Sequence, residues 1–317
     1  MRPAGLRGGG ALSPSFGFNE GFDSYTSPGE FEGLPSVVPR ALSFIRANRS
    51  RPMFVFMQGF DTDGQYMPPG GLTQKFVDRY HGSLTGTVQE EKKLREEGVV
   101  NTGISLQPAD VRLLRALYDE KVERADGEIA TFLSGFSKLH ISRPTVFVFT
   151  SDYGEEFYEH GRIDHGMTLY DEVLHVPLII ALPGQTKGRI ITDQVRNIDI
   201  MPTLLALTGT VPPAAVRAQM EGVSLIPTME GAHQHLNLFA ETSYRYATFL
   251  QSIRTWDGWK LIYDTNSILL NHVYDLNSDK GEQHDLTNTG NPMVSRMMSS
   301  FADLLGRIRA DNDRLHR

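Results

Sequence analysis

Acidic side chains follow two apolar runs of the sequence. Asp63 and Tyr66 lie in the loop after Met53–Met57, and Asp152 comes directly after Thr145–Thr150. Ligands of open α/β sheets bind at the carboxyl ends of the strands. A carboxylate there suits a hard divalent cation, which prefers oxygen ligands. The plainer alternative is that Asp152 caps a helix and that the rest is surface loop.

Two histidines, His160 and His165, follow Asp152 in the same segment. An imidazole can hold an anionic group or transfer a proton near neutral pH. We therefore treat both histidines as candidate catalytic residues.

The elements that must position these residues alternate along the chain. The continuous apolar runs Met53–Met57, Thr145–Thr150 and Val176–Ala181 indicate buried strands, and the periodicity over Ser36–Asn48 and Pro108–Lys138 indicates amphipathic helices. Strands without polar alternation, separated by helices, predict an α/β domain with a mostly parallel sheet covered by helices on both faces.

The pattern of apolar and polar residues changes near Gly231. Asp257 and Gly258 form a turn between two apolar-aromatic arms, which is a strong hairpin signal, and a helix is expected near Pro292–Arg309. The first residues are rich in Gly and Pro and predict little regular structure. We expect a loose N-terminal segment, an incomplete α/β domain and a small antiparallel sheet plus helix, over residues 1–15, 16–231 and 232–317.

The composition of the 317-residue chain excludes several classes of function. With 40% hydrophobic residues and a net charge of −7, most of the chain can fold, and the acidic balance argues against a general nucleic-acid binder. No apolar run is long enough to cross a bilayer, and no secretory signal is visible. The chain has no cysteine, which excludes disulfides, thiolate metal sites and a cysteine-derived nucleophile.

Several segments together resemble the sulfatase family of the alkaline phosphatase superfamily. They include the stretch that begins TSDYG, the segment VRNIDIMPTLLALTG, the strand WKLI and the signature VYDLNSDKGEQHDL, with FGFNEGFDSY upstream. The resemblance implies an alkaline-phosphatase-like α/β fold, here without the family's N-terminal strand, and hydrolysis of sulfate esters with a divalent cation.

The resemblance also implies roles for individual residues. Asp152 matches a metal-ligand aspartate, and Tyr153 stands where the family has a second ligand, asparagine or histidine. His165 matches a lysine or histidine that contacts the sulfate and helps the leaving oxygen depart, and His160 lies in the same loop. The expected cation is Ca²⁺, with Mn²⁺ as the alternative.

Two departures from the family pattern weaken this site. A tyrosine phenol, with a pKa of about 10, is a poor ligand at neutral pH, so Tyr153 removes one donor and the cation is expected to be weakly held. Asp63 stands where the family presents a histidine to the sulfate, and a carboxylate would repel an anionic substrate. Tyr66 and Pro69 match other positions of the same substrate-side loop.

The nucleophile motif of the family is absent from the sequence. The family uses a cysteine or serine in C/S-x-P-x-R, after a strand that ends in paired aspartates. The nearest run, Ser36–Arg40, has one residue too many and is interpreted as the start of a helix. Losing the nucleophile of a concerted set removes most of the rate enhancement.

Three interpretations stay open. The chain is a sulfatase-like hydrolase that is a fragment or poorly active as written, a degenerate binding protein without catalysis, or a phosphoester or phosphonate hydrolase of the same superfamily. The expected ligand is an anionic small molecule or a sulfated sugar, and an exposed sheet edge would permit oligomers. Family members are often periplasmic or secreted, whereas a genuine start at Met1 would point to the cytoplasm.

Overall fold

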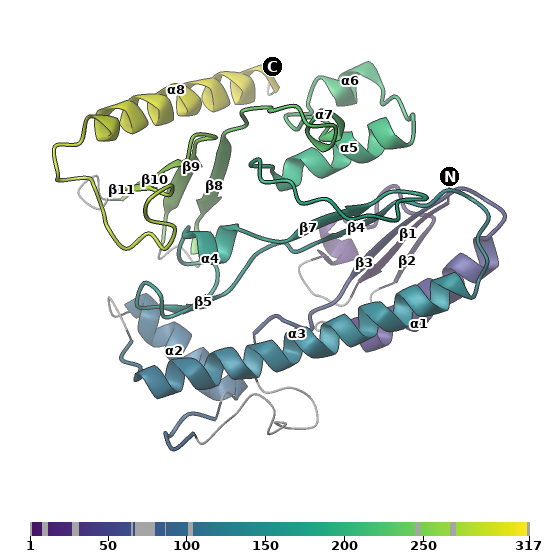
Figure 1. Cartoon of the computed structure of the whole chain (residues 1–317), viewed down its shortest axis with the longest axis horizontal. Coiled ribbons are helices and arrows are strands. Elements are labelled where there is room, and N and C mark those ends of the chain that lie inside the picture. Colours follow the sequence, from purple (N-terminus) through teal and green to yellow (C-terminus); the bar gives the residue numbers. More distant parts are fainter. Residues whose placement is uncertain are drawn as a thin grey trace. The chain divides into compact units, whose positions relative to one another are not determined.

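The computed structural model describes residues 2–7, 12–26, 32–64, 66, 80–85, 87–100, 104–244, 248–266 and 271–315 (Figure 1). The chain divides into two compact units. Unit 1 comprises Met1–Thr145 and Gly161–Asp164, and unit 2 comprises Val146–His160 and His165–Arg317. The division lies far from the boundary expected near residue 231, because Leu169 shares one core with the C-terminal residues Ile262 and Tyr274.

A three-stranded parallel sheet forms the centre of unit 1. Its middle strand is β1 (Arg2–Arg7), which pairs with β2 (Ser24–Thr26) on one side and with β3 (Met53–Gln58) on the other. The parallel pairing agrees with the predicted α/β class.

The expectation of a loose segment over residues 1–15 is wrong for Arg2–Arg7. Ala4 is fully buried and Leu6 is 3% exposed, so two apolar side chains on one face hold the strand in the core. On the other face, the ring of Tyr25 lies 2.3 Å from the place that a Cβ of Gly5 would take. Gly5 therefore allows the Tyr25 ring to pack closely against the strand, and it does not loosen the strand.

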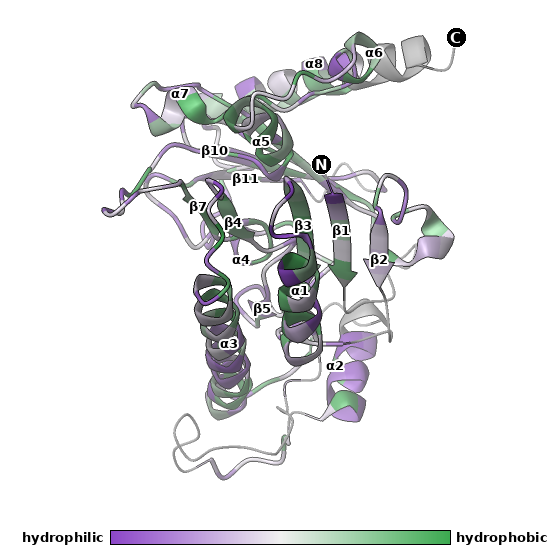
Figure 2. Cartoon of the chain, turned by 90° about the vertical axis from the view of Figure 1, so that its right-hand side faces the viewer, coloured by the Kyte–Doolittle hydropathy of each residue, from purple (hydrophilic) through white to green (hydrophobic). Residues whose placement is uncertain are grey.

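Three long helices accompany this sheet. The side chains of Val37 and Ala41, on α1 (Leu34–Asn48), pack against Leu6 of β1, and Phe132 of α3 (Pro108–Ser137) joins the same cluster. The run Ser36–Arg40 lies inside α1, which confirms its interpretation as part of a helix. The third helix, α2 (Val88–Val100), is mostly hydrophilic (Figure 2). The short elements of unit 1 are η2 (Pro14–Phe16) and β6 (Ile163–Asp164).

Unit 2 begins with the strand that precedes Asp152. This strand, β4 (Phe147–Thr150), pairs with β7 (Leu178–Ala181) in antiparallel orientation, whereas the sequence predicted parallel neighbours. Between them lie β5 (Glu156–Phe157) and α4 (Asp171–Leu174). The helical elements that follow are η3 (Asn197–Asp199), α5 (Ile200–Leu207), α6 (Ala214–Arg217) and α7 (Ile226–Met229).

The C-terminal part of unit 2 is a four-stranded antiparallel sheet with one long helix (Figure 1). Its strands, in spatial order β11-β10-β9-β8, are β8 (Leu238–Thr242), β9 (Leu250–Arg254), β10 (Trp259–Asp264) and β11 (His272–Asp275), and the helix is α8 (Pro292–Leu315). The predicted hairpin at Asp257 and Gly258 is confirmed, with Gly258 at a φ of +90°.

The two faces of this sheet bury different partners. Leu261 packs with Met297 and Phe301 of α8, whereas its neighbour Ile262 packs with Leu169, in the loop that precedes α4. Side chains alternate between the faces of a strand, so Lys260 shares the loop-facing side with Ile262. Among the described residues, no helix is long and apolar enough to span a membrane.

Two glycine substitutions should change stability in opposite directions. Gly5→Ala places a methyl group against the Tyr25 ring, and we expect the free energy of unfolding to fall by about 1–3 kcal/mol. Gly127→Ala, within α3, meets no described atom within 4 Å, and we expect a gain of about 0.5–1 kcal/mol from helix propensity. Urea unfolding of both variants tests this; equal effects would contradict the packing of β1.

Candidate active site

The carboxyl end of β4 presents the first predicted site residues. Asp152 is exposed, and within the described ranges its carboxylate has no hydrogen-bond or ion-pair partner. The turn itself is fixed by hydrogen bonds, since the Ser151 hydroxyl donates to the Tyr153 carbonyl at 2.6 Å and the Asn197 amide donates to the Ser151 carbonyl at 3.3 Å. Asp152 is therefore held on a defined turn with its side chain available.

Gly154 then brings the chain against the loop that precedes β7. Its N–H donates to the Val173 carbonyl at 2.8 Å, and the N–H of Glu155 donates to the Glu172 carbonyl at 3.0 Å. A Cβ on Gly154 would lie 2.1 Å from that Glu172 carbonyl oxygen, so only glycine permits this approach. The backbone of the site is thereby paired to α4.

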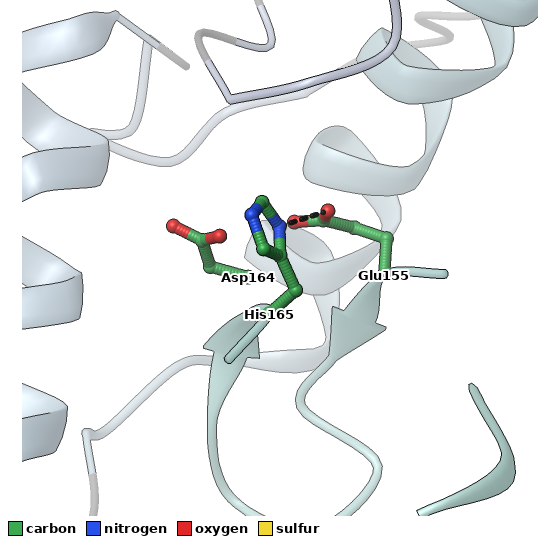
Figure 3. A group of neighbouring side chains, drawn as sticks. All are labelled: Glu155, Asp164 and His165. Atoms are coloured by element: carbon green, nitrogen blue, oxygen red, sulfur yellow. Dashed lines mark hydrogen bonds and ion pairs between the residues drawn. The ribbon is translucent and has the colours of Figure 1, made fainter. Parts of the chain in front are cut away.

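His165 lies between Tyr153 and Glu155. Its ring stacks on the Tyr153 ring with centroids 4.0 Å apart and planes 18° from parallel. Figure 3 shows its hydrogen bond with Glu155, in which Nδ1 is 3.1 Å from Oε2. The Glu155 side chain is 3% exposed. A carboxylate accepts hydrogen bonds, so Nδ1 is the donor in this contact and Glu155 fixes the tautomer and the orientation of the ring.

The third residue drawn in Figure 3, Asp164, belongs to unit 1 and forms an ion pair there with Arg95. Arg95 also contacts Glu91 at 3.2 Å, one helical turn away on α2. The Asp164 carboxylate is therefore already paired with an arginine, which it shares with Glu91.

His160 lies in a different environment from His165. Its Nδ1 is 2.5 Å from Glu172 Oε1, its Nε2 is 3.1 Å from the Glu282 carbonyl, and its ring stacks on Tyr170 at 3.5 Å. The Glu172 carboxylate can only accept, so Nδ1 donates to it, while Nε2 also lies 3.2 Å from the side-chain amide nitrogen of Gln283. Burial alone would lower the pKa of His160, but the Glu172 carboxylate, the Glu282 carbonyl and the charge of Glu156 together raise it. These contacts favour a positioning role for His160.

Glu156 is buried beside His160. It is 1% exposed and accepts hydrogen bonds from the Thr168 hydroxyl at 2.9 Å and from the His160 N–H at 3.2 Å. Burial raises the pKa of Glu156 to about 7, against the hydrogen bond from Thr168. Neither Glu155 nor Glu156 lies in a solvated turn, because both are buried and both carboxylates find donors inside the fold.

A buried ion network ties this loop to the C-terminal sheet. The Lys260 side chain is fully buried on β10, and its Nζ is 2.7 Å from Glu282 Oε1 and 2.9 Å from Asp171 Oδ1. Arg254 on β9 contacts the other oxygen of Asp171 at 2.7 Å, and the Asp171 N–H donates to Glu282 Oε2 at 2.6 Å. Lys260 and Glu282 fall in the WKLI and VYDL segments, which the sequence singled out without assigning them a role.

The predicted substrate-side residues lie in unit 1. Tyr66 is completely buried, and the backbone carbonyls of Asp63 and Gly64 accept hydrogen bonds from the Lys121 ammonium of α3 at 2.8 and 2.5 Å. Pro69 lies outside the described residues. The six predicted residues thus fall into one group in unit 1 and two clusters in unit 2.

The described residues of unit 2 do not complete a calcium site. Glu156, His160 and Glu172 place one ligand atom each within 4.8 Å of one another, but hydrogen bonds within the protein already occupy these groups. Asp152 offers a free carboxylate, and the Tyr153 ring is stacked on His165. Calcium takes six to eight oxygen ligands, so these residues alone fit only a weakly held cation.

Comparison with known proteins identifies the family. The sulfatase family model matches residues 13–210, and the model for the C-terminal region of N-sulphoglucosamine sulphohydrolase matches residues 158–310. The chain therefore belongs to the sulfatase family.

Individual relatives are identical to the chain at about a quarter of the aligned residues. Human arylsulfatase K is 28% identical over 192 residues, which cover 56% of this chain and 34% of the relative. The Delta 4,5-hexuronate-2-O-sulfatase of Bacteroides thetaiotaomicron is 26% identical over 198 residues, which cover 60% of this chain and 40% of the relative. The chain thus spans only about a third of the length of the curated relatives it matches.

Solved structures show the same fold. A protein in complex with its substrate D-glucosamine-2-N,6-O-disulfate matches 98% of this chain and 79% of its own, with a TM-score of 0.70 and 19% identity. Phosphonate monoester hydrolase of Agrobacterium radiobacter matches 98% of this chain and 78% of its own, with a TM-score of 0.71 and 16% identity. The alkaline-phosphatase-like α/β fold is therefore confirmed.

The buried Glu156 makes stability depend on pH. Between the ordinary pKa of 4.5 and the folded value of about 7, the folded chain keeps a proton that the unfolded chain has released. The contribution of Glu156 to stability therefore falls as the pH rises through this window, and His160 acts in the same direction because its pKa is also raised.

We expect urea unfolding between pH 5 and pH 8 to show a loss of stability that Glu156→Gln reduces by on the order of 2 kcal/mol. The exposed Glu221 provides the matched control, and Glu221→Gln should keep the pH dependence of the unmodified chain. An unchanged pH dependence in Glu156→Gln would show that this carboxyl is ionised in the folded state.

Proposed function

We propose that the chain is a sulfatase-like hydrolase of sulfate esters that uses a divalent cation, Ca²⁺ before Mn²⁺. The observation that carries the proposal is the Glu155–His165 hydrogen bond of 3.1 Å beside the exposed Asp152, in the segment matched by the family. A carboxylate for the cation and an oriented imidazole for the leaving group are two of the groups that sulfate-ester cleavage requires.

Each group has a defined task in this proposal. Asp152, with Tyr153 beside it, would hold the cation, which when bound supplies positive charge to the sulfate oxygens. As an imidazolium, His165 would donate its Nε2 proton to the ester oxygen that departs when a water oxygen bonds to the sulfur and the S–O ester bond breaks, and Glu155 fixes the ring for this transfer. His160, with both nitrogens engaged, would orient the loop instead of reacting.

Low turnover is part of the proposal. The sequence has no cysteine, and its nearest approach to the nucleophile motif lies within α1. Asp63 would oppose an anionic ligand, while Tyr66 would support the same loop. The missing nucleophile is expected to cost more than any other departure, because catalytic groups that act as a unit lose most of their effect when one is removed.

Sulfated sugars are the substrate class that we propose. Among the similar proteins are a Delta 4,5-hexuronate-2-O-sulfatase and a protein in complex with its substrate D-glucosamine-2-N,6-O-disulfate. The alternative is a degenerate protein that binds the same anionic ligand without cleaving it, which the tyrosine at position 153 and the aspartate at position 63 favour. A phosphoester or phosphonate hydrolase is a further alternative that shares the fold.

His165→Gln tests the proposed acid. With an aryl sulfate, an aryl phosphonate and Ca²⁺ present, we expect sulfate-ester hydrolysis by the unmodified chain to be slow, and His165→Gln to reduce it by about a factor of 10²–10⁴. His284→Gln is the matched control, since this side chain is 83% exposed, and it should leave the rate unchanged. A rate that His165→Gln does not lower would overturn the role of His165, and binding of the sulfate ester without any hydrolysis would favour the degenerate protein.

A further inference from the structure

Unit 1 contains an open hollow where α1 and α3 end. It has a volume of about 420 Å³ and is lined by Leu42, Arg46, Arg49, Gly135, Lys138, Leu139 and His140. This volume lies within the range of roughly 300–1,000 Å³ that is usual for small-ligand sites. No residue assigned above to the active site takes part in it.

The rim of the hollow is cationic. Arg46, Arg49, Lys138 and His140 are exposed, and within the described ranges none of their side chains forms a hydrogen bond or an ion pair. Cations near the carbonyl ends of two helices are favoured by the helix dipoles, which accounts for their presence there. They remain without a carboxylate partner, and their charge is available to a ligand.

The local charge is opposite to that of the whole chain. The net charge of the chain is −7, yet residues 33–60 and 129–145 contain no aspartate or glutamate. The same two stretches also carry Arg51 and Arg143, and Arg143 ties them together by donating to the Ser50 carbonyl at 3.2 Å. A positively charged cluster on a protein of negative net charge indicates an anionic partner.

The floor of the hollow is apolar. A Cβ on Gly135 would lie 2.5 Å from a methyl carbon of Leu42, so glycine lets the two helices approach closely, and Leu139 completes the surface. A sugar ring presents an apolar face together with outward substituents, which suits an apolar floor with a cationic rim. Among the described residues, no phenylalanine, tyrosine or tryptophan lines the hollow, whereas nucleic-acid bases stack on such rings.

We infer that this hollow is a docking surface for a linear sulfated polysaccharide, separate from the active site. Sulfate groups would pair with the cations of the rim, and one sugar ring would lie on Leu42 and Leu139. The choice of a sulfated polysaccharide over a nucleic acid rests in part on the proposed function. The presence of an anion-binding surface rests on the geometry and charge alone.

The test measures heparin binding by fluorescence anisotropy at low and moderate salt, with desulfated heparin and single-stranded DNA as comparison ligands. The full chain should bind heparin, and its affinity for heparin should fall as the salt concentration rises. It should bind desulfated heparin and DNA less tightly than heparin. The triple substitution Arg46→Ser, Arg49→Ser and Lys138→Ser should weaken heparin binding at least about tenfold, which corresponds to about 1.4 kcal/mol.

A second triple substitution controls for net charge. Lys92→Ser, Lys93→Ser and Lys280→Ser remove the same charge from exposed positions elsewhere and should change heparin binding less than about twofold. Equal weakening by both triples, no heparin binding at low salt, or tighter binding of DNA would each overturn the inference. Thermal unfolding of both triples verifies that they are folded.

The experiment separates this inference from the proposed function. His165→Gln should bind heparin as tightly as the unmodified chain, because His165 lies in unit 2 and is not part of the hollow. Heparin binding without any sulfate-ester hydrolysis would support the docking surface and contradict the proposed hydrolase activity. Hydrolysis of a small aryl sulfate without heparin binding would contradict the docking surface and leave the proposed hydrolase activity supported.

Discussion

The Lys260 ammonium is completely buried, and a buried charge must be neutralised where it lies. Asp171 and Glu282 do so at 2.9 and 2.7 Å, and they come from segments far apart in the sequence. This arrangement contributes little to stability over an apolar substitute, but removing one partner leaves the others uncompensated and typically costs 3–5 kcal/mol. The loop around Asp171 is therefore fixed in one position against the C-terminal sheet.

The geometry of the candidate active site follows from that fixed position. Asp171 is followed by Glu172, whose carboxylate holds His160 at 2.5 Å and whose carbonyl accepts the N–H of Glu155 at 3.0 Å. The Glu155 carboxylate in turn holds His165. Each of these contacts is a short hydrogen bond. The orientation of His165, the proposed acid, therefore depends on Lys260 of the antiparallel sheet. The C-terminal segments shared with the sulfatase family thereby acquire a function in positioning the loop.

The sequence predicted most helices and strands because their signals are local. The apolar run Met53–Met57 and the periodicity over Pro108–Lys138 correspond to β3 and α3. The sequence did not reveal that Arg2–Arg7 is a central strand, since its few apolar residues become meaningful only between β2 and β3. Nor did it reveal the burial of Glu155, because the histidine that binds this carboxylate is ten residues away and no local rule joins them.

Hydrogen exchange measured by mass spectrometry tests the positioning claim most directly. The peptides to follow span residues 151–175, in the unmodified chain, in Lys260→Met and in the double variant Lys260→Met with Glu282→Gln. We expect Lys260→Met to raise exchange across this loop, including the amides of Gly154 and Glu155, while β4 stays protected. The double variant should restore part of the protection. Exchange in 151–175 that is unchanged by Lys260→Met would show that the loop holds its shape without the buried network.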